Sequence, residues 1–161
     1  MVEQLLALSK LDNNIQDKAN DILDWKVMIS AIIDDYLTVI EDKKLNLKYQ
    51  IGDKNFLQQG NAFLCSLMLR NLIDNAVRYS GVNADIKVDI SEDCLCVTNN
   101  KTNIDKQHIL RLGERFFRPA GQKENGSGLG LSIVKKIASI HNCRIECSSN
   151  EDCFIVKIYP N

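Results

Sequence analysis

The chain has 161 residues, enough for one domain with a substantial core, alone or with a short extension. Hydrophobic residues make up 45% and charged residues 25% of it, which argues against intrinsic disorder, and the net charge of −1 gives no sign of a nucleic-acid or anionic-membrane partner. No apolar run approaches the ~20 residues of a membrane span, and the N-terminus lacks the blocks of a signal peptide. We therefore expect a soluble, cytoplasmic piece that does not contact the membrane.

Hydrophobic periodicity in the first half of the chain predicts two long helices and one clear strand. Asp24 is a suitable cap for the first long helix. In chain order we expect a short helix at residues 1–11, a polar stretch at 12–24 with a possible short strand before Trp25, a helix over 25–41, a strand over 45–51, and a helix over about 61–80.

The helix predicted at 61–80 carries an unusual polar face. Asn71, Asn75 and Arg78 fall within about 60° of one another at helical periodicity, opposite an apolar stripe. Asparagine is a poor helix former, so two of them at i and i+4 beside an arginine are unusual and raise the hypothesis of a binding face, although the helix alone does not favour it. The alternative is a solvated face that happens to hold two amides.

The second half of the chain predicts two hairpins around a long irregular loop and a third long helix. We expect strands at 84–90 and 94–98, a short helix at 104–112, a lid or binding loop at 113–127, a helix over 129–140, and strands at 143–148 and 153–159. The non-alternating order of about five strands and three long helices predicts an α+β fold with the helices on one face of the sheet.

Residues 126–134, GSGLGLSIV, place three glycines at alternate positions before an apolar helix. This pattern is no dinucleotide fingerprint, because Leu131 stands where the third glycine belongs, and it lacks the lysine of a Walker loop. Glycine-rich backbone at a helix N-terminus suits phosphate, and amide oxygens suit Mg²⁺. Together with the asparagines, the stretch predicts a nucleotide-phosphate site.

The six cysteines do not show the paired spacing of a zinc site, and a disulfide framework is expected mainly in small secreted chains. We expect reduced cysteines that pack as small apolar residues.

Three segments in order resemble the ATP-binding catalytic domain of sensor histidine kinases, in the superfamily shared by gyrase, Hsp90, histidine kinases and MutL. NLIDNAVRYS resembles the N box, LGERFFRP resembles the F box, and GSGLGLSIV resembles the second glycine box. The sequence of the last two boxes is most similar to that of the quorum-sensing (Qse-type) sensor kinases. The resemblance covers nearly the whole chain. It implies a Bergerat-type two-layer α/β sandwich, with a mixed sheet of about five strands and three helices on one face. Residues 1–12 would be a remnant of the dimerisation-domain helix, and 13–161 the ATP-binding catalytic domain.

The resemblance also implies residue roles in binding ATP and Mg²⁺. Asn75 would be the metal ligand, with Asn71 supporting the metal or its water. The proposed catalytic residues are Asn71, Asn75 and Arg115. The nucleotide would be bound by Asn71, Asn75, Arg78, Tyr79, Asn99, Ile104, Arg115, Arg118, Gly126, Ser127, Gly128, Leu129, Gly130 and Leu131. Phe116 and Phe117 would either plug the lid or dock a partner domain.

Two departures from related patterns bear on the reaction. Members of the superfamily that hydrolyse ATP carry a glutamate where this chain has Asn71, and an amide cannot serve as a general base, so phosphoryl transfer is favoured over hydrolysis. The usual Asp-x-Gly-x-Gly box is replaced by residues 99–103, NNKTN. Asn99 offers adenine an uncharged acceptor, which predicts weaker ATP binding by about 1–2 kcal/mol, or roughly tenfold.

The resemblance predicts that the γ-phosphoryl group goes to a histidine on a separate dimerisation domain and then to a response regulator. His108 and His141 lack the family's acceptor context, and His141 is expected to cap a helix C-terminus. We expect the parent to be a homodimeric inner-membrane sensor whose cytoplasmic part contains this chain. The alternatives are an anti-sigma-type serine kinase of the same fold and a degenerate, non-catalytic nucleotide- or protein-binding module.

Overall fold

A computed structural model describes residues 20–100, 111, 114–117, 128–150 and 153–161. The short helices expected at 1–11 and 104–112, and most of the loop expected at 113–127, lie outside the described residues. The helices are α2 (Trp25–Asp42), α3 (Ala62–Tyr79) and α5 (Gly130–Ile140). The strands are β1 (Asp21–Ile22), β2 (Asn46–Ile51), β3 (Gln59–Gly60), β4 (Asp85–Ile90), β5 (Leu95–Asn99), β6 (Cys143–Asn150) and β7 (Cys153–Pro160).

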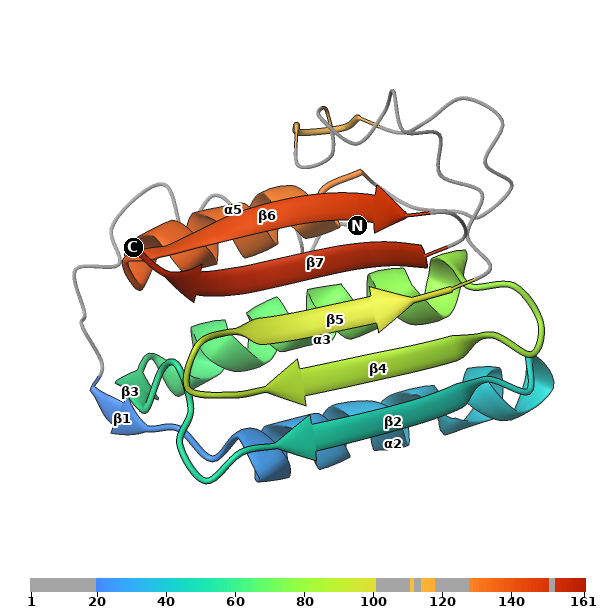
Figure 1. Cartoon of the computed structure of the whole chain (residues 1–161), viewed down its shortest axis with the longest axis horizontal. Coiled ribbons are helices and arrows are strands. Elements are labelled where there is room, and N and C mark those ends of the chain that lie inside the picture. Colours follow the sequence, from blue (N-terminus) through green and yellow to red (C-terminus); the bar gives the residue numbers. More distant parts are fainter. Residues whose placement is uncertain (1–19, 101–110, 112–113, 118–127, 151–152) are drawn as a thin grey trace.

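Five strands form one mixed sheet in the order β2-β4-β5-β7-β6. β2 and β4 run parallel, and the other neighbours are antiparallel. Figure 1 shows α2, α3 and α5 side by side behind this sheet, so the described part of the chain is a two-layer sandwich. The predicted fold class is confirmed.

The two longest helices begin at the caps that their sequences offer. The Asp24 side chain accepts a hydrogen bond from the backbone N–H of Val27 at 3.0 Å, which confirms it as the cap of α2. Asn61 does the same for α3, accepting from the N–H of Leu64 at 3.0 Å. Each cap satisfies one of the N–H groups that a helix start leaves unpaired.

The core lies between the sheet and the helices. The stripe predicted on α3, Leu69, Leu72, Ile73 and Ala76, is buried. Strand β4 alternates, with its isoleucines and valine buried and the intervening Asp85, Lys87 and Asp89 on the other face. The face away from the helices is thus polar, and an ion pair between Lys87 and Asp89 (2.9 Å) lies on it. At β4, only the face of the sheet that packs against the helices contributes to the core.

β1 and β3 form a separate two-stranded sheet, of which only the first strand was predicted. A short strand before Trp25 was expected, but its partner β3 was not, because two residues give no periodic signal. The indole N–H of Trp25 donates to the carbonyl of Leu57 at 2.9 Å, and its ring lies 5.6 Å from that of Phe56. These contacts fix the connection from β2 to α3.

His141 caps α5, as expected, and also joins α5 to α3. Its Nδ1 lies 2.9 Å from the carbonyl of Ile137, and its Nε2 accepts from the N–H of Asn61 at 3.1 Å. These two partners assign a neutral ring with the proton on Nδ1. One side chain therefore holds the end of α5 against the beginning of α3.

All six cysteines are free. Cys65 and Cys143 are buried and the other four are partly exposed, so the packing prediction holds in full for two of them. Burial raises the pKa of Cys65 to about 12, with smaller contributions from Cys143 and Asp21. Cys65 is therefore an inert core thiol at neutral pH.

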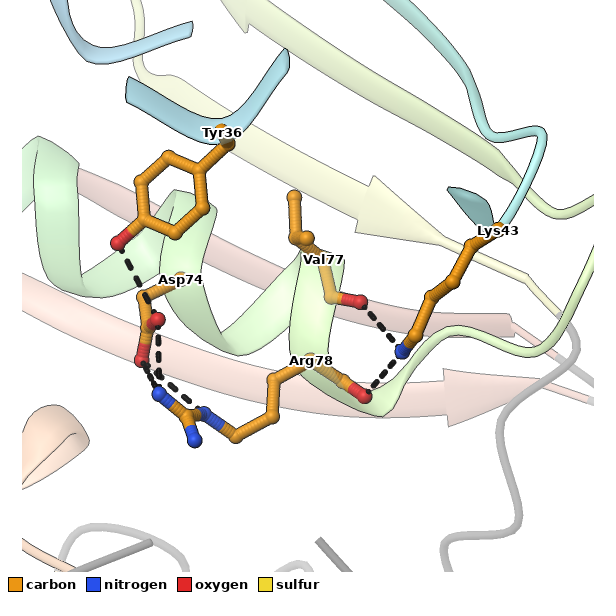
Figure 2. Close-up of polar contacts among 5 residues, drawn as sticks. All are labelled: Tyr36, Lys43, Asp74, Val77 and Arg78. Carbon is orange, nitrogen blue, oxygen red and sulfur yellow. Dashed lines mark hydrogen bonds and ion pairs between the residues drawn. The ribbon is translucent and has the colours of Figure 1, made fainter. Parts of the chain in front are cut away.

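Lys43, just after α2, closes the C-terminus of α3. Its Nζ donates to the carbonyls of Val77 (3.0 Å), Arg78 (2.8 Å) and Ser80 (3.1 Å), the first two of which are drawn in Figure 2. The last carbonyls of a helix lack intrahelical partners and carry partial negative charge, so an ammonium group is well placed there.

We expect Lys43→Met to lower the free energy of unfolding by about 2 kcal/mol, because it removes charge-assisted hydrogen bonds but keeps the aliphatic chain. Chemical denaturation measures the change. The matched control is Lys44→Met, at the exposed neighbouring lysine, which should unfold like the wild type. Equal stability of the two variants would show that the cap contributes nothing.

Candidate functional site

The two asparagines of α3 face the first residue of α5. A Cβ atom built on Gly130 would lie 3.3 Å from Asn71 Oδ1 and 3.4 Å from both Oδ1 and Nδ2 of Asn75. Residues 59 and 55 positions apart in the sequence are therefore close in space, and any side chain larger than that of glycine at position 130 would crowd the two carboxamides. The structure brings the asparagine pair and the glycine stretch into one place.

Asn71 is held in a defined orientation. Its Nδ2 donates to the carbonyl of Leu67 one turn earlier at 2.8 Å, and the residue is 5% exposed. Because the amide nitrogen is engaged by the helix, Oδ1 is the atom that faces Gly130. Asn75 is half-buried, and within the described part of the chain no hydrogen bond holds its side chain. Its amide oxygen is therefore available to a ligand.

Helix α5 begins beside these amides without a side-chain cap. Its N-cap residue is Leu129, which is 1% exposed and makes no capping hydrogen bond through its side chain, and no acidic residue lies in the first turn. The N–H groups of a helix start need acceptors and carry partial positive charge. This helix start therefore suits an anion such as a phosphate group.

Gly128 connects this helix start to the short segment 114–117. Its φ is +69°, and a Cβ there would lie 2.8 Å from the carbonyl carbon of Phe116, so the position requires glycine. Phe116 also has a positive φ, of 65°, and its N–H donates to the Gly128 carbonyl at 3.1 Å. The F box and the glycine box are thus in direct backbone contact.

The two phenylalanines differ in exposure. Phe116 is 64% exposed, whereas Phe117 is partly buried under the guanidinium of Arg111, 4.1 Å above its ring. Arg111 also pairs with Glu114 at 3.1 Å. Arg115 is exposed in the same turn. Whether this turn plugs a lid or docks a partner stays a prediction.

Asn99 is buried at the end of β5 and pairs with the end of α3. Its Nδ2 donates to Ser80 Oγ at 3.1 Å, and both residues are 3% exposed. An asparagine in place of an acidic residue needs a partner for its NH₂ group, and Ser80 is that partner. This arrangement leaves the acceptor oxygen of Asn99 for a ligand.

Arg78 lies at the edge of the asparagine face and is bound to Asp74. Arg78 Nη2 lies 3.0 Å from both carboxylate oxygens, and Nε lies 3.3 Å from Oδ2. Tyr79, the last residue of α3, and Leu131 are partly buried. Four predicted site residues lie outside the described ones: Ile104, Arg118, Gly126 and Ser127.

Sequence reasoning missed Asp74, Tyr36 and Lys43. The i,i+4 spacing of Asp74 and Arg78 is a signal for an ion pair and was visible in the sequence. Tyr36 and Lys43 come from the region of α2, more than 30 positions away, and no local pattern marks them.

The described residues hold no group of three or more His, Cys, Asp or Glu side chains able to bind a metal ion. A divalent ion would have to be held by amide oxygens together with oxygens of its ligand. The amide oxygens of Asn71 and Asn75, which lie beside the start of α5, are the kind of ligand that such a shared ion would use.

The two-layer fold, with the asparagine amides of α3 beside the glycine-rich start of α5, is typical of a class of nucleotide-binding domains. A family model described as "Histidine kinase-, DNA gyrase B-, and HSP90-like ATPase" matches residues 60–160, and the chain belongs to that family. Within this family, the chain is 39% identical over 153 residues to the sensor protein QseC of Escherichia coli K12. The matched region covers 94% of this chain and 34% of QseC. It is 32% identical over 155 residues to the heme sensor protein HssS of Staphylococcus haemolyticus, covering 94% of the chain and 33% of HssS.

Solved structures agree with these matches. The cytoplasmic segment of histidine kinase QseC has a TM-score of 0.65 and 27% identity, covering 99% of this chain and 89% of that one. The catalytic domain of histidine kinase ThkA shares the fold, with a TM-score of 0.72, 19% identity, and coverage of 88% and 95%. The chain is therefore an ATPase-type domain that is similar to those of sensor histidine kinases, and it spans about a third of the length of the curated relatives that it matches. No helix among the described residues has the length and hydropathy to cross a membrane.

Proposed function

We propose that this chain binds Mg-ATP and transfers the γ-phosphoryl group to a histidine on a separate dimerisation domain of its parent. The observation that carries the proposal is the position of Gly130 against Asn71 and Asn75, which brings a pair of hard oxygen ligands to the start of helix α5. Phosphoryl transfer depends mainly on charge neutralisation and alignment, and a Mg²⁺ ion held by these amides together with the helix start would supply both.

Each part of the site has a role in this proposal. A bound Mg²⁺ would neutralise phosphate charge, with Asn75 as its ligand and Asn71 as support. The start of α5 and the glycines at 126, 128 and 130 would receive the phosphates, and Leu129 and Leu131 would wall the pocket. Arg78 and Tyr79 would contact phosphate or ribose.

The remaining assignments concern the lid and the adenine. Arg115 or Arg118 would reach the phosphates from the lid, and Asn99 and Ile104 would contact the adenine. Asn71 occupies the place of a hydrolase's glutamate, and an amide cannot take a proton from water, so transfer is favoured over hydrolysis.

The chain would be one part of a longer signalling protein. Residues 1–12 would end the dimerisation helix, and 13–161 would form the catalytic domain. The parent would be a homodimeric sensor of the inner membrane that passes the phosphoryl group on to a response regulator. Similarity over about a third of the length of QseC and HssS supports this placement.

One experiment tests the proposed reaction directly. The chain is mixed with Mg-ATP labelled at the γ-phosphate and a separately prepared dimerisation domain, and label on that domain is measured before and after acid treatment. Acid-labile label is the expected result, because phosphohistidine is unstable in acid. Acid-stable label would indicate a serine kinase, and absence of nucleotide binding at millimolar concentration would indicate a non-catalytic module.

Asn99→Asp should tighten binding of ATP analogues by about tenfold, because a charged acceptor strengthens the hydrogen bond to the adenine amino group. Ser80 accommodates the change, since its hydroxyl donates as readily as it accepts. Calorimetric titration with a non-hydrolysable ATP analogue measures the effect. Unchanged or weaker binding by a folded variant would remove Asn99 from the adenine site.

A further inference from the structure

Helix α2 reaches the candidate phosphate-binding face through a three-residue chain of contacts. The phenol of Tyr36 donates to Asp74 Oδ1 at 3.1 Å, and Asp74 in turn holds the guanidinium of Arg78. Figure 2 shows the three side chains in line, from Tyr36 on α2 to Arg78 on α3. No residue of α2 belongs to the site proposed above, so this contact extends the site to a new element.

The geometry of α3 explains why Arg78 needs such a restraint. At 100° per residue, Arg78 points between the directions of Asn71 and Asp74. Helix α5 packs on the asparagine side of α3, and α2 packs on the other side. The ion pair with Asp74 therefore fixes how far the guanidinium leans toward α2. The Arg78 and Asp74 side chains are only 37% and 25% exposed, so water screens the pair less than it would a surface pair.

Tyr36 remains a donor under physiological conditions. Burial, followed by the charge of Asp74 and the hydrogen bond to it, raises the pKa of Tyr36 to about 12. The charge of Arg70 on α3 and its hydrogen bond to the phenol lower the pKa of Tyr36, with a smaller effect. The phenol thus keeps its proton at neutral pH and remains a hydrogen-bond donor to Asp74, which also pairs with Arg78.

We propose that Tyr36 and Asp74 are positioning residues that set the guanidinium of Arg78 for contact with the phosphates of a bound nucleotide. The inference rests on the proposed function, in which Arg78 contacts phosphate. A restrained arginine has already lost rotamer freedom that an unrestrained one would lose on binding. The bonds to Asp74 engage Nε and Nη2 of the guanidinium and so fix its plane relative to the carboxylate.

Calorimetric titration of the 161-residue chain with Mg²⁺ and a non-hydrolysable ATP analogue tests the inference. We expect affinity to fall about thirtyfold for Arg78→Ala, about tenfold for Asp74→Asn and about threefold for Tyr36→Phe. The decisive measurement is Tyr36→Phe combined with Arg78→Ala. If Tyr36 acts only through Arg78, the double variant binds as R78A alone does.

Two substitutions on the face of the sheet away from the helices serve as matched controls. Tyr159→Phe removes a phenol-to-carboxylate hydrogen bond of 3.0 Å to Glu146, and Asp89→Asn removes a carboxylate paired with Lys87. Both should bind the analogue like the wild type. Thermal unfolding of every variant identifies any change in affinity that comes from a loss of folded protein.

Three results overturn the inference while leaving the proposed function intact. The first is that folded Y36F and D74N bind the analogue with wild-type affinity. The second is that Tyr36→Phe lowers the affinity by the same factor in the wild type and in R78A. The third is that D74N binds the analogue more tightly than the wild type. The last would show that Asp74 competes with phosphate for Arg78. The proposed function itself fails in a different way, when the wild-type chain does not bind the analogue. Wild-type affinity of R78A would remove Arg78 from the site and the inference with it.

Discussion

The Asn75→Ala variant is expected to lose Mg²⁺-dependent binding of ATP analogues, by at least about a hundredfold, and to keep the fold of the wild type. The amide oxygen of Asn75 lies beside the start of α5, where a shared metal ion would meet the phosphates. Removing it leaves that ion without its main protein ligand. Titrations of wild type and variant, with and without Mg²⁺, measure the effect.

The same substitution should not destabilise the protein. No described residue hydrogen-bonds to the Asn75 side chain, so its removal orphans no buried group, and alanine is the better helix former by about 0.7 kcal/mol. The matched control is Asn46→Ala, an exposed asparagine of β2 bonded to Asp85, which should bind like the wild type. If N75A binds Mg-ATP analogues as tightly as the wild type, the metal site is wrongly placed.

Helix α3 shows what a sequence determines locally. Its buried stripe and its asparagine face both follow from a 3.6-residue period, and its cap at Asn61 precedes the apolar run. The same reasoning gave α2 with its Asp24 cap and the main strands, and hence the fold class. Such features depend on neighbours within one or two turns, which a single sequence displays.

Features that depend on distant partners were out of reach. Ser80 is the partner of Asn99 across 19 positions, and Lys43 caps α3 across more than 30. Neither residue has a local pattern that marks its partner, because the contacts exist only once α2 and β5 have packed beside α3. The role of Tyr36 was missed for the same reason, although the Asp74–Arg78 spacing alone predicts an ion pair.

The proximity of the asparagines of α3 to the glycine-rich segment before α5 was predicted in part. Glycines at alternate positions predicted a close approach of backbone to ligand, and the asparagines predicted a metal-binding face. Their proximity followed from the family resemblance rather than from any periodicity. The structure adds the specific contact, in which Gly130 lies close against the carboxamides of Asn71 and Asn75.

Gly130→Val should weaken binding of Mg-ATP analogues by at least about thirtyfold while the protein remains folded. A Cβ at this position already lies 3.3–3.4 Å from the two carboxamides, and the extra methyl groups of valine would fill the space that the ligand needs. Gly130 opens α5, and its φ is not among the positive values, so the backbone tolerates a side chain there. Calorimetric titration measures the affinity, and thermal unfolding measures the stability.

Gly130→Ala provides an internal scale for this test, since one methyl group fills less of the space and should weaken binding less than valine does. Ser139→Val is the matched control, at an exposed position of the same helix, and should leave binding unchanged. A graded loss from alanine to valine at constant stability is what steric occupation of the site requires. If G130V binds as the wild type does, the space between the amides and α5 is not where the phosphates and metal lie.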